Sequence, residues 1–246
     1  MSNAVLITVR LKSTRLKKKV MLEYKGKPVL EYMTNRLKHN FDGRVVICTS
    51  THPEDIPLVD FARKAGIECF AGSEEDVLER YFETCKAFGL DKIYIVYGDE
   101  PFTDIDTMRW NFDTLTLDEP MWIKNDALPE GTYGYGLNFK GIEYLHRNKL
   151  SENLEVWQIM ASEMPIRKIE SHTGMRNVYE NIRLTIDYPE DFDVFKRIID
   201  YIGKDYTGVK LAELVKLYNT LDLYKINGFR IEEYKARIKA QGTINQ

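Results

Sequence analysis

The chain has 246 residues, of which 43% are hydrophobic and 30% charged, and its formal net charge is −3. This composition is typical of a soluble globular protein with a sizeable core, and the slightly acidic balance argues against a nucleic-acid binder. Its three well-separated cysteines indicate reduced thiols rather than a disulfide framework or a zinc site. No apolar run approaches the roughly 18 residues of a membrane span, and the N-terminus lacks a signal-peptide pattern, so we expect a cytoplasmic protein without membrane partners.

Strand and helix patterns alternate through about the first hundred residues. Short apolar runs predict strands over residues 5–9, 44–48, 67–70 and 91–97. Apolar residues at helical spacing predict helices over 29–39, 53–66 and from a capping box at 73–76 to about 89. Connections of this length require parallel strands, so we expect an α/β fold with a doubly wound sheet.

The second half of the chain has a different pattern. It predicts helices over 104–115, 141–148, 154–163, 189–202, 209–219 and 230–241, and strands over 121–124, 132–139, 165–170 and 179–186. We expect residues 120–180 to form an insertion that leaves the sheet, which the chain then rejoins at 181–187. Because the sequence contains no internal repeat, residues 1–246 are predicted to form a single domain.

A strongly basic loop follows the first predicted strand. It contains six cations and two hydroxyls: Arg10, Lys12, Arg15, Lys17, Lys18 and Lys19, with Ser13 and Thr14. Guanidinium and ammonium groups bind phosphate oxygens, and open α/β sheets bind ligands beyond the carboxyl ends of their strands. The loop therefore predicts a polyphosphate site. The alternatives are a solvated basic surface and a nucleic-acid patch.

Two acids follow later strands of the predicted sheet. Asp99 comes directly after Gly98 at the end of the fourth strand, and Asp187 ends the apolar run 182–186. Each acid alone is also consistent with an N-cap of the following helix. Together they predict a shared Mg²⁺, which takes one or two carboxylates and completes its shell with phosphate oxygens and water. Cations that neutralise pyrophosphate and a metal that polarises a phosphate are sufficient for nucleotidyl transfer.

Several motifs, in order along the chain, resemble one enzyme family. The pattern Arg10-x-x-Ser-Thr-Arg-Leu-x-x-Lys19 is similar to the N-terminal signature of the CMP-sugar synthetases, especially CMP-Kdo synthetase and the spore-coat-polysaccharide cytidylyltransferases. Gly98-Asp-Glu-Pro101 matches a motif of the Kdo enzymes. Residues 48–55, 72–80 and 183–191 resemble the spore-coat branch, and the similarity extends over nearly the whole chain.

The resemblance implies a Rossmann-like fold with a mostly parallel central sheet, helices on both faces and an inserted subregion for dimerisation and acceptor binding. It implies a Mg²⁺-dependent transfer of CMP from CTP to an acidic sugar or a sugar or polyol phosphate, with release of pyrophosphate, for surface-polysaccharide biosynthesis. The usual assembly is a homodimer. The resemblance assigns Arg10, Arg15 and Lys19 to the triphosphate, Asp99 and Asp187 to Mg²⁺, and Ser13, Thr49, Ser50, Ser73, Glu74, Asp76 and Gly98 to the rest of the nucleotide site.

The chain departs from the family pattern at three places that concern the acceptor. The first loop has lysines where relatives have Gly-Ser and Pro-Gly-Lys, residues 131–136 lack the acids of the spore-coat pattern, and residues 154–157 stand where that pattern has a Glu-His pair. The extra lysines favour an anionic acceptor. Tyr133, Tyr135 and Trp157 are predicted either to stack on a ligand or to pack in the core or a dimer. The alternative function is a CTP-binding, non-catalytic homologue or assembly protein, but retention of both acids favours an enzyme.

Overall fold

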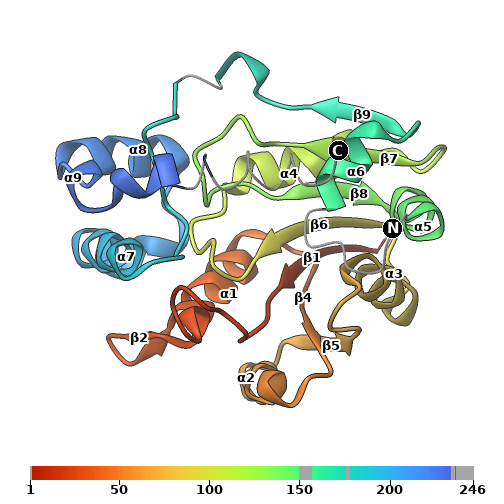
Figure 1. The fold of residues 1–246 in the computed structure, drawn as a ribbon, viewed down its shortest axis with the longest axis horizontal. Helices are drawn as coiled ribbons and strands as arrows, with labels where there is room; N and C mark the ends of the chain where they lie inside the picture. The colour runs from red at the N-terminus through yellow and green to blue at the C-terminus, as the bar shows by residue number, and fades with distance from the viewer. Residues whose placement is uncertain (1, 150–156, 176–177, 234–235, 237–246) are drawn as a thin grey trace.

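The computed structural model describes residues 2–149, 157–175, 178–233 and 236 (Figure 1). A seven-stranded sheet forms its centre, in the order β5-β4-β1-β6-β8-β7-β9. The parallel half contains β1 (Asn3–Thr8), β4 (Arg44–Ser50), β5 (Glu68–Gly72) and β6 (Lys92–Tyr97). The other half contains β7 (Met121–Lys124), β8 (Tyr135–Asn138) and β9 (Arg167–Glu170), of which β8 runs antiparallel to both of its neighbours. The predicted mostly parallel α/β sheet is confirmed.

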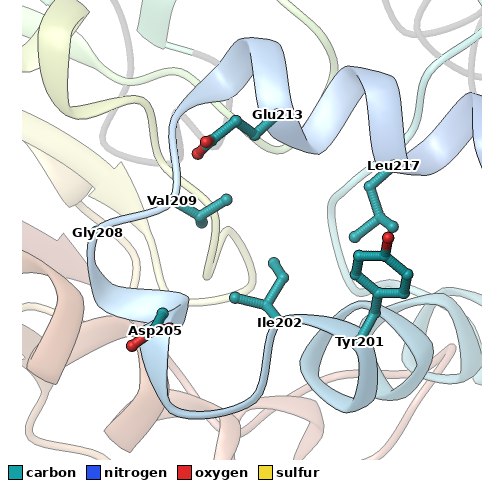
Figure 2. A pocket seen from close by; sticks show the side chains of 7 residues that line it. All are labelled: Tyr201, Ile202, Asp205, Gly208, Val209, Glu213 and Leu217. Atoms are coloured by element: carbon teal, nitrogen blue, oxygen red, sulfur yellow. The ribbon is translucent and has the colours of Figure 1, made fainter.

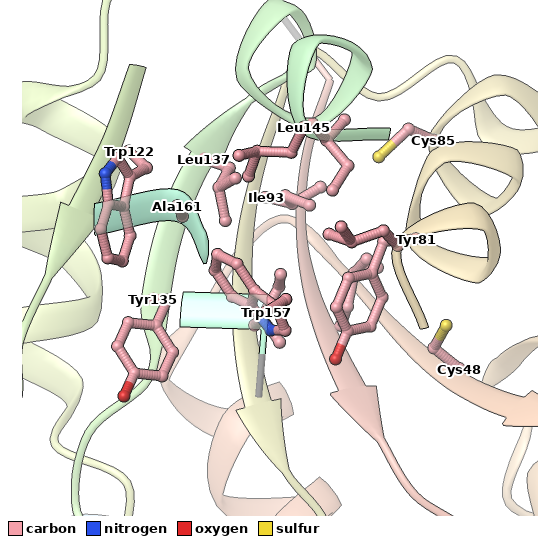
Figure 3. Close-up of a cluster of buried hydrophobic side chains, with 14 of the residues drawn as sticks. Cys48, Tyr81, Cys85, Ile93, Trp122, Tyr135, Leu137, Leu145, Trp157 and Ala161 are labelled. Carbon is pink, nitrogen blue, oxygen red and sulfur yellow. The ribbon is translucent and has the colours of Figure 1, made fainter. Parts of the chain in front are cut away.

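Helices cover both faces of this sheet. One face packs against α1 (Val29–Asn40), α2 (Ile56–Ala65) and α4 (Ile105–Thr114). The other packs against α3 (Val77–Phe88), α5 (Phe139–Asn148) and α6 (Trp157–Glu163) (Figures 1 and 3). Along β1, Val5 and Ile7 join the first core while Ala4 and Leu6 join the second. A strand buried on both faces carries apolar residues at every position, which explains the unbroken apolar run at the N-terminus.

A third layer of helices lies beyond the tips of β1 and β6 (Figure 1). It consists of α7 (Pro189–Ile202), α8 (Leu211–Thr220) and α9 (Tyr224–Asn227), with their own buried cluster. Short elements connect the larger ones: η1 (Lys19–Met21), the hairpin β2 (Glu23–Tyr24) and β3 (Lys27–Pro28), η2 (Pro53–Asp55), η3 (Thr173–Met175) and η4 (Gly203–Thr207). None of the helices in these described ranges is long and apolar enough to cross a membrane.

The insertion predicted over 120–180 does not leave the sheet, because it contributes β7, β8 and β9 to it. The strand predicted over 179–186, by which the chain was expected to rejoin the sheet, is wrong. Ile182, Leu184 and Ile186 are buried against the third layer of helices instead. The segment is extended, but its backbone bonds go to two loops: the amide of Leu184 donates to the carbonyl of Glu130 at 2.7 Å, and that of Ile186 to the carbonyl of Asp99 at 2.9 Å. The alternation of apolar residues in this segment therefore reflects burial against helices, and the segment pairs with none of the described strands.

Three predicted boundaries move for local reasons. The strand predicted from 132 begins only at Tyr135, because Gly131 has a φ of +88° and a Cβ there would lie 2.1 Å from the amide nitrogen of Thr185. Asn138 then caps α5 by accepting from the amide of Gly141 at 2.7 Å, so this helix begins earlier than predicted. Helix α3 begins at residue 77, not 73. The start of the helix predicted at 154–163 and most of that at 230–241 lie outside the described residues.

Candidate active site

The strand order places the loops after β1 and β6 at one edge of the sheet. From β1 the chain proceeds outward to β4 and β5, and then returns to β6 on the opposite side of β1. Ligands of open α/β sheets bind at the carboxyl ends of the strands where the order reverses in this way. The basic loop and the loop containing Asp99 both leave this edge, so the fold brings two of the predicted site segments together.

A single ammonium group joins the two predicted metal acids. Lys19 Nζ donates to Oδ2 of Asp99 and, at 2.6 Å, to Oδ1 of Asp187. The guanidinium of Arg15 donates to the same Oδ1 of Asp187, also at 2.6 Å. These four residues come from three distant parts of the chain, and the structure brings all four of these predicted site residues into one cluster.

The charges in this cluster stabilise one another. Burial alone would raise the pKa of Asp187, whose side chain is 6% exposed, but Lys19, Arg15 and Arg183 outweigh it and lower this pKa. Burial alone would lower the pKa of Lys19, but Asp99 and Asp187 outweigh it and raise this pKa. At neutral pH these shifts favour a charged carboxylate on Asp187 beside a charged ammonium on Lys19.

A buried arginine that the sequence analysis missed, Arg183, holds the carboxylate of Asp187 in place. Arg183 is fully buried and donates to Oδ2 of Asp187 at 3.3 Å, to both oxygens of Asp191 at 2.9 and 3.0 Å, and to Oε1 of Glu130 at 2.6 Å. Asp191 also accepts from the amide of Asp187 at 2.9 Å. One oxygen of Asp187 is thus bound to Arg183, and the other faces Lys19. The signal in the sequence is a charged residue inside an apolar run.

Two further acids beside the cluster have raised pKa values. Burial raises the pKa of Glu130 to about 7, although Arg183 opposes the shift. Burial, with a contribution from Asp99, raises the pKa of Glu100 well above its usual range, and its Oε2 accepts from the amide of Tyr97 at 3.3 Å. Both shifts favour the neutral acid, so these residues are poorer candidates for metal binding than Asp99 and Asp187.

The basic loop is also tied to the loops after β4 and β5. The guanidinium of Arg10 donates to the carbonyl of Glu74 at 2.8 Å, and Lys12 lies 3.2 Å from a carboxylate oxygen of the same residue. The amide of Leu11 donates to Asp55 at 2.6 Å, and Ser50 donates to the other oxygen of this carboxylate. The carboxylate of Asp55 thus positions the start of the basic loop, a role that sequence reasoning did not find.

Several residues predicted around the nucleoside are buried, and most of them already bond within the protein. Thr49 is fully buried, but its Oγ1 has no hydrogen-bond partner among the described residues, and Ser50 is 2% exposed. Asp76 caps α3 by accepting from the amide of Glu79 at 2.9 Å and pairs with Lys149. Ser73, half-buried like Ser13 and Glu74, accepts from the amide of Asp76 at 3.0 Å. Contacts of all these side chains with a nucleoside stay predictions.

Gly98 is required by packing within the protein. A Cβ at this position would lie 2.7 Å from Cγ2 of Val9 and 3.3 Å from Cγ1 of Val20. The amide of Gly98 donates to the carbonyl of Thr8 at 3.0 Å. The glycine therefore lets the start and end of the basic loop lie against the end of β6, which brings Lys19 close to Asp99. Its predicted contact with a nucleotide stays untested.

The aromatic side chains of the altered segments pack in the core. Tyr135 and Trp157 are 8% and 1% exposed, with ring centroids 5.5 Å apart (Figure 3). Trp157 also packs edge-on against Trp122 at 5.8 Å, and Tyr133 contacts Tyr135 at 6.0 Å. In this structure Tyr135 and Trp157 contribute to the core and present little surface to a ligand.

A pocket of about 470 Å³ lies at the third helical layer, between the end of α7 and the start of α8 (Figure 2). It is lined by Tyr201, Ile202, Asp205, Gly208, Val209, Glu213 and Leu217. These side chains are apolar or acidic, and none of the predicted site residues is among them. The pocket lacks the cations that a triphosphate requires, so it does not fit the predicted nucleotide.

The paired carboxylates fit a metal that arrives with a phosphate ligand. Within the described ranges, no three His, Cys, Asp or Glu side chains gather into a metal-binding cluster. Mg²⁺ does not need such a cluster, because one or two carboxylates, phosphate oxygens and water complete its shell. Asp99 and Asp187 already share one cation, so their oxygens are close enough to bind the same ion.

The sequence matches a cytidylyltransferase family profile along most of its length. Residues 4–223 match the profile of a family described as cytidylyltransferase. The chain is 26% identical to the spore coat polysaccharide biosynthesis protein SpsF of Bacillus subtilis over 229 residues, covering 87% of this chain and 92% of that protein. It is 25% identical to the uncharacterized protein MJ1063 of Methanocaldococcus jannaschii over 229 residues, or 81% of this chain and 90% of that protein.

A shorter match and a solved structure extend these findings. A 3-deoxy-manno-octulosonate cytidylyltransferase of Aeromonas salmonicida is 32% identical over 120 residues, which is 47% of this chain and 46% of that enzyme. A cytidylyltransferase structure from Leptospira borgpetersenii has a TM-score of 0.82 and 23% identity, and covers 92% of this chain and 98% of that one. The structural likeness confirms the predicted Rossmann-like fold.

Proposed function

The chain belongs to the cytidylyltransferase family, and on that premise we propose that it transfers CMP from CTP, with Mg²⁺, to an acidic sugar or a sugar or polyol phosphate and releases pyrophosphate. Family membership confirms the predicted nucleotidyltransferase class. One observation carries the rest of the proposal: Lys19 contacts both Asp99 and Asp187, with Arg15 beside them. Cations for a triphosphate and carboxylates for its metal thus meet at the sheet edge where ligands bind.

In this proposal the basic loop binds and orients the triphosphate. Lys19 and Arg15 reach the phosphate oxygens and neutralise the charge that develops on the pyrophosphate leaving group. Asp99 and Asp187 hold Mg²⁺, which supplies Lewis-acid stabilisation of phosphate charge and lowers the pKa of an attacking hydroxyl. Arg183 and Asp191 keep the carboxylate of Asp187 directed toward the loop.

The acceptor in this proposal is anionic. Lys12, Lys17 and Lys18 are exposed in the loop that also contains Lys19, and so add positive charge around the transfer site. Two relatives carry names that point to surface saccharides, a spore coat polysaccharide protein and a 3-deoxy-manno-octulosonate cytidylyltransferase. We therefore extend the proposal to surface-polysaccharide biosynthesis, in the cytoplasm and as a homodimer.

Pyrophosphate release tests this function directly. The protein is incubated with Mg²⁺, each of the four nucleoside triphosphates in turn, and pools of ulosonic acids, sialic-type acids, and sugar or polyol phosphates. We expect release with CTP and one acceptor class, and none from an Asp99→Asn control. Tight CTP binding without release from any pool would instead support a non-catalytic CTP-binding protein. Release with a different triphosphate would overturn the proposal.

A further inference from the structure

Lys19 lies where the proposed metal would bind. Its ammonium contacts Oδ2 of Asp99 and Oδ1 of Asp187, the oxygens through which the two acids would share one ion. We propose that Lys19 is a placeholder for the metal: it pairs with both acids in the nucleotide-free protein and moves to the phosphates when metal and nucleotide bind together. This inference rests on the proposed function, because it concerns the same site.

The geometry does not allow the ammonium and the metal to occupy these contacts together. Mg²⁺ binds carboxylate oxygens at about 2.0–2.1 Å, so an ion shared by the same two oxygens would lie between them. Lys19 Nζ already lies there, 2.6 Å from Oδ1 of Asp187. The other oxygen of Asp187 accepts from Arg183 at 3.3 Å and is therefore less available to a metal. A metal that binds through the two oxygens now bonded to Lys19 therefore requires Lys19 to leave.

The lysine side chain can leave without unfolding the loop. Lys19 begins η1, whose turn is closed by the amide of Met21 donating to the carbonyl of Lys18 at 2.8 Å, and the adjacent Val20 is buried. These contacts hold the backbone, while rotation of the long side chain moves the ammonium. Its side chain is only 13% exposed, so leaving the acids without gaining another anion would be unfavourable.

A triphosphate supplies that other anion. When its phosphates accept the ammonium, Lys19 exchanges one set of anionic partners for another, and the two acids become available to the metal. Metal and nucleotide then strengthen each other's binding, and the coupling is reciprocal. Arg15 also contacts Asp187, but among the described side chains Lys19 alone bonds to both acids. The coupling is therefore expected to depend on Lys19.

Mn²⁺ binding measured by electron paramagnetic resonance tests the exchange. Without nucleotide, we expect Lys19→Met to bind Mn²⁺ about tenfold more tightly than the wild type, because the competing cation is gone. Lys17→Met removes one charge from the same loop at an exposed position and serves as the matched control, with wild-type affinity expected. With CTP, the wild type should gain about tenfold or more in Mn²⁺ affinity, and Lys19→Met should gain much less. The double variant Asp99→Asn, Asp187→Asn corrects for Mn²⁺ held by CTP alone.

Two results would overturn the inference. One is a Lys19→Met protein that binds Mn²⁺ no more tightly than the wild type, and the other is a wild-type affinity that CTP does not change. Circular dichroism confirms that the variant is folded, and Lys19→Gln provides a second neutral side chain. The nucleotide-free measurement needs neither turnover nor an acceptor. Tighter Mn²⁺ binding by Lys19→Met thus supports the exchange even where a failed pyrophosphate assay rejects the proposed function.

Discussion

The two acids that share Lys19 are held by very different surroundings. Asp99 lies in the loop after β6, and its side chain is 19% exposed. Its carboxylate accepts a hydrogen bond from Lys19. Asp187 is 6% exposed and bonds to Lys19, Arg15 and Arg183. It belongs to the segment that packs under the third helical layer. We therefore expect the two acids to contribute unequally to stability, although the proposed function gives them equal roles in holding the metal.

The largest expected effect is the same for both acids. Asp99→Asn and Asp187→Asn should each lower CMP transfer by about a thousandfold or more, because each removes a carboxylate from the metal and several kcal/mol of transition-state stabilisation. Pyrophosphate release measures the loss. Near-wild-type turnover in either variant would remove that residue from the proposed metal site.

Substitution of Arg183 tests whether the buried surroundings of Asp187 contribute strongly to the stability of the fold. Arg183→Met should lower the free energy of unfolding by about 3–5 kcal/mol, because it leaves Asp191 buried without its cation and removes one of the three cations beside Asp187. Arg15→Met is the matched control, since its side chain is 30% exposed and its loss should cost about 1 kcal/mol or less. Urea denaturation measures both. Equal losses in the two variants would mean that the buried contacts of Arg183 contribute no more to stability than the partly exposed contact of Arg15.

Glu130, which accepts from Arg183 beside Asp187, should make the free energy of unfolding depend on pH. Its pKa is raised from 4.5 to about 7 in the folded chain, so the native state binds more protons than the unfolded state in that window. Stability from this group is present below pH 4.5 and is lost as the pH rises through about 7, by about 3 kcal/mol in total. Glu130→Gln should remove this part of the decline. Urea denaturation from pH 4.5 to 8 measures it, and parallel profiles for the two proteins would contradict it.

The smallest expected effect is a difference in stability between alanine variants of the two acids. Asp187→Ala should cost about 1–2 kcal/mol of stability, because Arg183 loses one of its buried partners. Asp99→Ala should stay within about 0.5 kcal/mol of the wild type, since its carboxylate is partly exposed. Thermal denaturation of the two variants side by side provides the measurement. A larger loss for Asp99→Ala would reverse the comparison.

The parallel half of the fold was predictable because its signals are local. Buried parallel strands and amphipathic helices leave their patterns within short windows, and Asp99 at the end of β6 follows from the same alternation. Strand topology then brings Lys19 and Asp99 to one edge, whereas Asp187 reaches Lys19 from a segment outside the sheet. The Lys19–Asp99 half of the cluster was therefore accessible from sequence, while Asp187 was placed at the end of a strand prediction that proved wrong.

The supporting contacts were not predictable because they join distant segments. Arg183 and Glu130 are 53 positions apart, and Leu11 and Asp55 are 44 apart. Local periodicity contains no information about such pairs. For the same reason residues 179–186 resembled a strand: their apolar alternation was real, but their partners proved to be helices and loops.

A crystal structure with CTP and Mn²⁺, using anomalous scattering to locate the metal, tests the central claim most directly. The account predicts one metal peak in contact with both Asp99 and Asp187, with the ammonium of Lys19 turned to the phosphates. A metal held by the phosphates alone, with Lys19 still joining the two acids, would contradict it.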